Sequence, residues 1–225
     1  MCGRYSLHSN PHVVALQFGL AHPPEYAARY NVAPGTPVLA VRAAHDHARS
    51  GALLHWGLIP SWAKPGIGNR LINARAETVL DKPSFRTAFR RRRCIIPANG
   101  YYEWASTGGR KQPYYVRPRG DALFGFAGLY EQWHGTDRPL ESCTIITTDA
   151  NELTRPVHAR MPVILPVEAY THWLDPDNPD LDALAALLAP APAEHMSVHP
   201  VGLLVNNVKN EGPALVESEA LRQLF

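Results

Sequence analysis

The sequence has few cysteines and no long apolar run, and each absence excludes a class of protein. Only three of its 225 residues are cysteine, and no two of them form a CxxC pair. The sequence therefore predicts neither a disulfide framework nor a structural zinc site. No segment approaches the ~18 consecutive apolar residues of a membrane span, and no secretory signal is recognisable at the N-terminus. We expect a protein of the cytoplasm that makes no contact with membranes.

The chain also lacks a strong net charge. Its formal net charge is only +2 at pH 7, so a polyanionic partner must be held by a local cluster of basic residues and not by the field of the whole protein. The densest cluster is the run of four arginines at positions 90–93. Such a run is typical of a solvated surface, but this one is also the richest source of positive charge for phosphates.

The apolar residues predict one domain of the α+β class that covers residues 1–225. A hydrophobic content of 45% suffices for a sizeable core, and 21 prolines with 16 glycines indicate many turns. Predicted strands outnumber helices and do not alternate with them as in a βαβ fold. We therefore expect mostly antiparallel, curved sheets that form a barrel-like core, with short helices outside it. The predicted helices cover residues 11–18, 82–90, 149–154, 167–174 and 181–188.

Polar residues at alternate positions stand out in one otherwise apolar segment. Asn73, Arg75 and Glu77 occupy every second position, so they would share one face if residues 71–78 are extended. That face would combine an amide, a guanidinium and a carboxylate. An exposed polar strand edge explains the same pattern.

Two further ionisable residues lie where acid–base chemistry is conceivable. Glu103 lies among aromatic residues, where burial would raise the pKa of its carboxyl group and suit it to acid–base catalysis. The alternative is a glutamate neutralised by a nearby arginine. His158 shares a short loop with Arg160, just before a buried strand. A single histidine is more often structural than catalytic.

The second residue is a cysteine, and this position gives it a chemistry that internal cysteines lack. If Met1 is removed, Cys2 carries a free α-amine and a thiol on neighbouring carbons. Such a 1,2-aminothiol can close a five-membered ring with an aldehyde. The two groups have ordinary pKa values of about 8 and about 8.5, so both need assistance to react near neutral pH. Cys2 on its own is also consistent with an accident of the start codon.

These features together resemble the SOS response-associated peptidase (SRAP) family over nearly the whole chain. No single motif is decisive, but the motifs match the family in their order and spacing. They are MCGRY at residues 1–5, RYNVAPGT at 29–36, WGLIPSW at 56–62, INARAET at 72–78, RCIIPANGYYEW at 93–104, HARMPVIL at 158–165, and HPV and NVKNEG near the end.

The resemblance implies covalent crosslinking to abasic sites in single-stranded DNA through Cys2. The Cys2 amine would attack C1′ of the ring-opened sugar to give an imine, a lyase-like step, and the thiol would then close a thiazolidine. The adduct would shield the lesion during the SOS response. The resemblance also implies that Asn73 positions the sugar, that Glu103 transfers protons, and that His158 acts as an acid or base on the sugar.

Single-stranded DNA that contains an abasic site is the partner implied by the resemblance, with no metal and no cofactor. The implied phosphate contacts are Arg4, Arg75 and Arg160, and less directly Arg86 and residues 90–93. Trp62 and Pro34 would offer flat surfaces on which a flanking base stacks. Because recognition would rest on backbone charge and a missing base, no sequence readout is expected. We expect a monomer in the nucleoid, which replication or repair proteins could also contact.

Two other functions stay open. The first is a thiol peptidase that uses Cys2 and His158, with Glu103 or Asn73 completing the hydrolytic set. It would act on its own N-terminus and could also act on other proteins. The second is a module that binds single-stranded DNA without a covalent bond. It predicts salt-dependent binding and no adduct.

Overall fold

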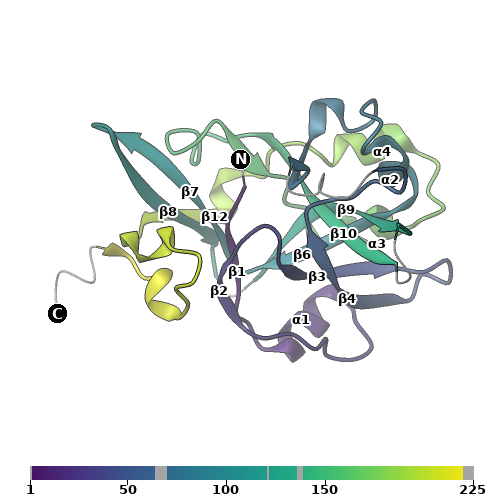
Figure 1. The fold of residues 1–225 in the computed structure, drawn as a ribbon, viewed down its shortest axis with the longest axis horizontal. Coiled ribbons are helices and arrows are strands. Elements are labelled where there is room, and N and C mark those ends of the chain that lie inside the picture. The colour runs from purple at the N-terminus through teal and green to yellow at the C-terminus, as the bar shows by residue number, and fades with distance from the viewer. Residues whose placement is uncertain (1, 64–69, 121, 136–138, 220–225) are drawn as a thin grey trace.

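The fold consists of short strands and even shorter helices (Figure 1). The structure is a computed structural model and describes residues 2–63, 70–120, 122–135 and 139–219. The strands are β1 (Tyr5–Leu7), β2 (Arg29–Val32), β3 (Pro37–Ala43), β4 (Arg49–Trp56), β5 (Asn73–Arg75), β6 (Arg93–Ala98), β7 (Gly100–Thr107), β8 (Arg110–Pro118), β9 (Phe124–Trp133), β10 (Leu140–Asp149), β11 (Arg160–Pro162) and β12 (Met196–Pro200). The α-helices are α1 (Pro11–Phe18), α2 (Arg86–Arg91), α3 (Tyr170–Leu174) and α4 (Leu181–Ala186). The 3-10 turns are η2 (Ala76–Thr78), η3 (Val167–Ala169), η4 (Ala193–His195), η5 (Leu203–Asn206) and η6 (Pro213–Leu215).

Five strands close into a barrel in the order β10, β4, β3, β6, β9 and back to β10. Strand β10 pairs with β4 in parallel, whereas the other neighbours in the ring are antiparallel. Beyond β4, strand β5 continues the parallel pairing along β10, and β11 pairs antiparallel with the end of β10. The prediction of a barrel-like core built mostly from antiparallel strands is therefore confirmed.

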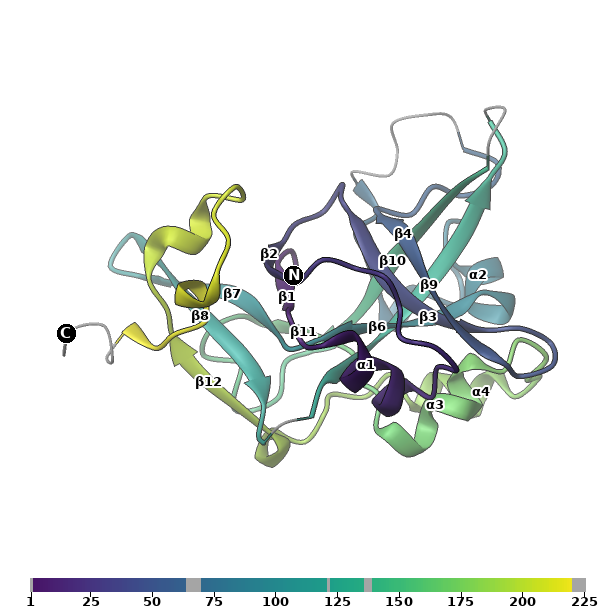
Figure 2. The same ribbon diagram turned by 90° about the horizontal axis from the view of Figure 1, so that it is seen from below.

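A second, antiparallel sheet has the order β12, β8, β7, β1, β2. Figures 1 and 2 show this sheet beside the barrel, with the N-terminus between the two. One apolar core joins them, because the rings of Tyr5 and Tyr101 both pack against Phe126 of β9 with centroids 6.1 Å apart. The N-terminal strand therefore lies at the junction of the two sheets.

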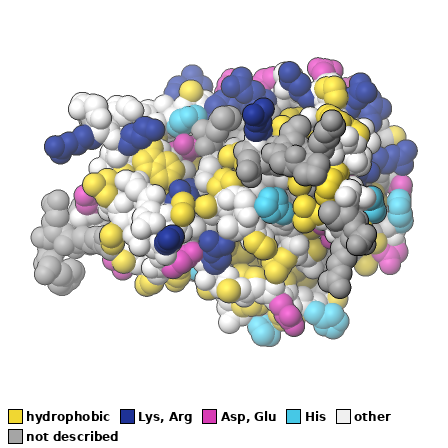
Figure 3. All heavy atoms as spheres, in the orientation of Figure 1, with side chains coloured by type: hydrophobic (Ala, Val, Ile, Leu, Met, Phe, Trp, Pro, Cys, Tyr) yellow, Lys and Arg dark blue, Asp and Glu magenta, His cyan; other side chains and the backbone are white. Residues whose placement is uncertain are grey.

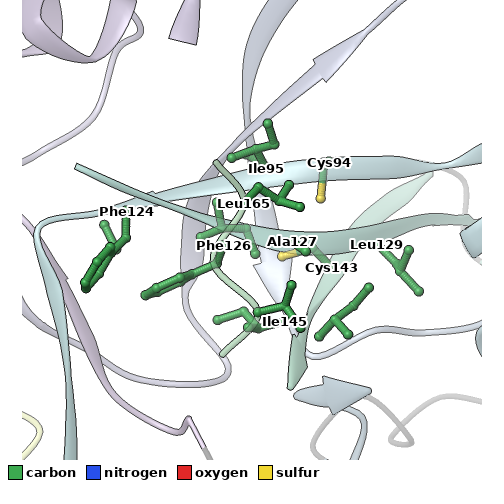
Figure 4. Packing of buried hydrophobic residues seen from close by; sticks show 14 of the residues in the cluster. Cys94, Ile95, Phe124, Phe126, Ala127, Leu129, Cys143, Ile145 and Leu165 are labelled. Atoms are coloured by element: carbon green, nitrogen blue, oxygen red, sulfur yellow. The ribbon is translucent and has the colours of Figure 1, made fainter. Parts of the chain in front are cut away.

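Apolar side chains from β6, β9 and β10 pack together inside this core (Figure 4). Cys94, Phe126 and Ile145 are all fully buried. Gly128 lies where these strands approach closely, since a Cβ atom there would be 2.9 Å from Cys94 Sγ and 3.2 Å from the Thr144 carbonyl oxygen. A larger residue at Gly128 would push the strands apart.

The helix predicted at residues 11–18 forms as α1 with those bounds. Asn10 caps it, because its side-chain oxygen accepts a hydrogen bond from His12 N at 2.9 Å, and Pro11 occupies the first turn. Gly19 ends it in the left-handed conformation, with φ 67°. In the described part of the chain, no helix is both long and apolar enough to cross a membrane.

The helix predicted at residues 149–154 is wrong, because the chain forms a series of turns there. Asn151 Oδ1 accepts hydrogen bonds from the backbone N and the Oγ1 of Thr154, both at 3.0 Å. Strand β10 runs to Asp149 and Pro156 has no backbone N–H, so only a single turn fits between them, in which Arg155 N donates to the Asn151 carbonyl at 2.9 Å. The helix predicted at residues 82–90 begins four residues later, at Arg86, after a stretch of turns.

The run of four arginines divides into exposed and buried members. Arg90 and Arg91 are exposed, whereas Arg93 is buried and donates hydrogen bonds only to backbone carbonyls. Its acceptors are the carbonyls of Phe89 at 2.6 Å, Arg90 at 2.8 Å, Trp173 at 2.7 Å, and Asp175. These carbonyls lie at the C-terminal ends of α2 and α3, where a helix has no donors of its own. Arg93 therefore joins two helices and is not available to phosphates.

Replacing Arg93 with alanine is expected to lower the free energy of unfolding by about 3 kcal/mol or more, because several buried carbonyls lose a charged donor. Arg91→Ala is the matched control, and its exposed side chain should change that free energy by less than about 0.5 kcal/mol. Urea unfolding followed by circular dichroism measures both. Equal, small losses in the two variants would contradict the structural role of Arg93.

Candidate functional site

Cys2 is fully buried where the chain enters the second sheet. Its carbonyl oxygen accepts a hydrogen bond from Asn73 Nδ2 at 2.9 Å, and two residues later the carbonyl of Arg4 accepts one from Tyr102 N at 2.9 Å. Burial, together with the negative charge of Glu103, raises the pKa of the Cys2 thiol well above its ordinary value. The thiol is therefore protonated at neutral pH and lies close to a carboxyl group.

Asn73 connects the N-terminal residues to the barrel. It begins β5, where it pairs with Ile145 of β10. Its Nδ2 donates to Cys2, whereas its Oδ1 is buried and has no hydrogen-bond partner in the described part of the chain. A buried acceptor without a donor is unfavourable. Asn73 Oδ1 is thus a candidate to accept a hydrogen bond from a ligand, for example from a sugar hydroxyl.

Glu103 lies on β7 and is only 6% exposed. Burial raises the pKa of its carboxyl group, and the positive charge of His158 partly opposes this rise. The same carboxylate charge acts on the Cys2 thiol, so Glu103 lies close to both residues. A carboxyl group with a raised pKa, next to a potential nucleophile, can act as a general acid or base.

His158 lies in the turn that connects β10 to β11. Its Nδ1 accepts a hydrogen bond from the backbone N of Arg160 at 3.0 Å. The same Nδ1 lies 3.2 Å from the Arg160 carbonyl oxygen. The short loop that His158 and Arg160 share in the sequence therefore fixes the position of the ring.

The four residues predicted to be catalytic meet at one site although they come from four segments. Cys2 precedes β1, Asn73 lies on β5, Glu103 on β7 and His158 before β11. Among the described residues, no three His, Cys, Asp or Glu side chains gather in a way that could hold a metal ion. The arrangement can place an acid–base pair next to a nucleophile, and the individual roles stay predictions.

Tyr101 is a further candidate that the sequence pattern did not single out. It lies two residues before Glu103 on β7 and is fully buried. Burial above all, with the neighbouring acidic groups of Cys2 and Glu103, raises the pKa of the Tyr101 hydroxyl well above its ordinary value. The alternation of side chains along a strand is the signal that could have found it, since residues two apart share a face.

Arg4 is tied to the C-terminal part of the chain. Its Nη1 donates to Asn31 Oδ1 at 2.8 Å and to the Val205 carbonyl at 2.7 Å, and its guanidinium lies 5.7 Å from the centroid of the Trp104 ring. Asn31 in turn donates to backbone carbonyls of residues 205–210. Sequence reasoning missed Asn31, whose place in the RYNVAPGT motif was the available signal.

Arg160 is held by two carboxylates. Glu77 accepts hydrogen bonds from Nη1 at 2.5 Å and from Nη2 at 3.0 Å, and Asp149 accepts one from Nη1 at 2.9 Å. The face predicted for residues 73, 75 and 77 ends early, because β5 stops at Arg75 and η2 begins at Ala76. Glu77 therefore leaves the strand and reaches Arg160.

The other residues predicted to contact DNA differ in the solvent exposure of their side chains. Trp62 is 64% exposed, as stacking on a base requires. Arg75 and Arg86 are exposed, and Pro34 is half-buried in the turn after β2. On the face shown in Figure 3, basic side chains gather along the upper edge. Contacts between these residues and DNA stay predictions.

Comparison with known proteins finds relatives over the whole length of the chain. A family described as SOS response associated peptidase (SRAP) matches residues 1–208. Abasic site processing protein YoqW of Bacillus subtilis (strain 168) is 46% identical, over 97% of this chain and 100% of that protein. Abasic site processing protein YedK of Escherichia coli (strain K12) is 33% identical, over 96% of this chain and 99% of that protein.

A crystal structure of a protein from Bacteroides thetaiotaomicron shares the fold. It superposes with a TM-score of 0.86 at 29% sequence identity, over 96% of this chain and 99% of the other. The barrel and the second sheet described above are therefore an arrangement that a solved structure also has.

Replacing Glu103 with glutamine is expected to stabilise the protein more at neutral than at acid pH. Because the pKa of Glu103 is raised in the folded state, the unfolded chain loses its proton first, and stability falls as the pH rises above about 4.3. Glutamine has no proton to lose. The gain of Glu103→Gln over wild type, measured by urea unfolding, should thus grow between about pH 4 and about pH 7. A gain that shrinks over this range would contradict the raised pKa.

Proposed function

This chain belongs to the SOS response associated peptidase (SRAP) family, and on that basis we propose that it processes abasic sites in single-stranded DNA through a covalent bond to Cys2. The relatives YoqW and YedK are named abasic site processing proteins. The observation that carries the proposal is the position of Cys2, whose carbonyl is held by Asn73 and whose thiol lies beside Glu103. An N-terminal aminothiol held there would meet an aldehyde next to an acid–base group.

The reaction begins at the amine that removal of Met1 would create. The amine attacks C1′ of the ring-opened deoxyribose and forms a C–N bond, and the former carbonyl oxygen leaves as water to give a protonated imine, whose nitrogen keeps one of the two amine protons. The raised pKa of Glu103 keeps its carboxyl group protonated more readily than that of an ordinary glutamate. Glu103 can therefore give a proton to the departing oxygen.

The thiol of Cys2 completes the adduct in a second step. Its sulfur adds to the carbon of the protonated imine, and its proton passes to the carboxylate that Glu103 became in the first step, which restores the carboxyl group. The nitrogen keeps the proton that it carried in the protonated imine. The product is a thiazolidine, and the sequence of steps uses no oxidant and no cofactor. Ring closure removes the imine from which strand cleavage could proceed, so the adduct would shield the lesion.

The neighbouring residues would bind the lesion and open its sugar. Asn73 Oδ1, which has no donor in the described structure, would accept a hydrogen bond from the sugar. His158, whose ring is held by its contacts with the backbone of Arg160, would act as the acid on the ring oxygen. The proposed contacts to the flanking strand are Arg4, Arg75, Arg86 and Arg160 for phosphates, and Trp62 and Pro34 for bases. The protein would work as a monomer on DNA in the cytoplasm.

Peptidase chemistry is the second candidate, because the family carries that description. A thiol peptidase needs a thiolate as its nucleophile. Burial and Glu103 both raise the pKa of the Cys2 thiol, and Cys94 and Cys143 are fully buried as well. We therefore propose that any peptidase activity is limited to the removal of Met1.

A single-stranded oligonucleotide with one abasic site is expected to form a heat-stable adduct with the protein that lacks Met1, seen on a denaturing gel and by intact mass. Cys2→Ala should form none. A matched control keeps Cys2 but carries one extra, uncleaved residue before it, and it should also be inert because its amine is an amide. A folded wild type without Met1 that gives no adduct would refute the proposal.

A further inference from the structure

Arg160 uses almost all of its hydrogen-bond donors within the protein. A guanidinium has five N–H groups. Nη1 donates to Glu77 and Asp149, and Nη2 donates to Glu77 and to the Thr147 carbonyl at 2.7 Å. The fifth donor, Nε, is buried and has no partner in the described part of the chain. A DNA phosphate can therefore bind Arg160 only if it replaces one of the present acceptors.

The two carboxylates are not equally easy to replace. Glu77 holds the guanidinium through both of its oxygens, whereas Asp149 accepts a single hydrogen bond. The Asp149 side chain is 73% exposed, compared with 49% for Glu77. The Arg160 side chain is only 12% exposed, but Asp149 reaches it from the solvent through a single contact, so Asp149 can turn away into water at modest cost. Glu77 and Thr147 would still hold Arg160 in place.

The charge at this position also matters for an approaching strand. One guanidinium faces two carboxylates, and the positive charge of Arg75 also acts on Glu77, so Glu77, Asp149, Arg160 and Arg75 together carry no net charge. The cluster therefore offers an approaching phosphate no net attraction, although it contains two arginines. Removing one carboxylate would give the cluster a net charge of +1 and leave one N–H of Nη1 free.

We propose that Asp149 occupies, in the free protein, the place on Arg160 that a DNA phosphate takes in the complex. This inference rests on the proposed function, in which Arg160 contacts the strand. A carboxylate oxygen and a phosphate oxygen are acceptors of the same kind for a guanidinium. By competing with the phosphate, Asp149 weakens the binding of every single strand, damaged or intact. The protein then dissociates readily from an intact strand. Discrimination between damaged and intact DNA therefore depends on the covalent step at Cys2.

Asp149→Asn tests this exchange through binding to a lesion-free oligothymidine, measured by fluorescence anisotropy over a range of salt concentrations. We expect about two- to fivefold tighter binding than wild type near ~0.1 M salt, the range of one exposed ion pair. The dependence of log affinity on log salt should steepen by up to about 0.7, as for one more phosphate contact. Asp149→Ser should change binding in the same direction, which guards against an effect of the asparagine amide.

Two controls separate this exchange from a general loss of negative charge. Glu152→Gln removes the same charge from an exposed glutamate in the following turn, and it should give a clearly smaller gain. In an Arg160→Gln background, Asp149→Asn should give no gain at all. Unchanged or weaker binding in both Asp149 variants, or an equal gain in Glu152→Gln, would overturn the inference. Failure of the proposed function is seen separately, as a wild type that binds DNA but forms no adduct with an abasic site.

Discussion

The hydrogen bond from Asn73 to the carbonyl of Cys2 is the contact on which the candidate site depends. A chain terminus ordinarily frays, yet an N-terminal nucleophile must be held in a defined place to react efficiently. Strand β1 is paired on both sides, by β2 and β7, which fixes the residues that follow Cys2. Asn73 adds a tie to the barrel through β5 and β10. Cys2, the proposed reactive residue, is thus held where the two sheets meet.

Burial then determines the chemistry that this residue can perform. Burial raises the pKa values of both the Cys2 thiol and the Glu103 carboxyl group, and the charge of Glu103 raises the pKa of the thiol further. Such an environment disfavours a mechanism in which Cys2 must already be a thiolate before it attacks. The environment is more compatible with a reaction in which the amine attacks first and the thiol then gives its proton to the carboxylate of Glu103. The barrel and its apolar core are what keep water from restoring ordinary pKa values.

Much of this arrangement follows from the sequence by simple rules. Apolar runs separated by Gly and Pro predicted the strands of the barrel, and Asn10, Pro11 and Gly19 predicted both ends of α1. The helix predicted at residues 149–154 was wrong because β10 continues to Asp149 and leaves only one turn before Pro156, and the local sequence pattern does not show where that strand ends. Neighbouring arginines read alike in sequence, yet Arg93 is buried and Arg91 is exposed.

The candidate site was predictable as a set of residues but not as a set of contacts. Family motifs pointed to Cys2, Asn73 and Glu103, and the fold brings these three together. What the motifs could not give was the pairing of donors and acceptors across distant segments. Arg160 is the clearest case, because its partners Glu77 and Asp149 come from η2 and β10. Such pairings depend on strand register and on where a strand ends, which local sequence determines only weakly.

The most direct test of the central claim asks whether both reactive groups of Cys2 enter the adduct. The protein without Met1 is reacted with an abasic single strand, denatured, treated with iodoacetamide and digested, and its N-terminal peptide is mapped by mass spectrometry. The account predicts a sugar remnant on Cys2 and no alkylation of its thiol, because the sulfur is part of the ring. An adduct whose Cys2 thiol is alkylated, or one that lies on a lysine, would contradict it.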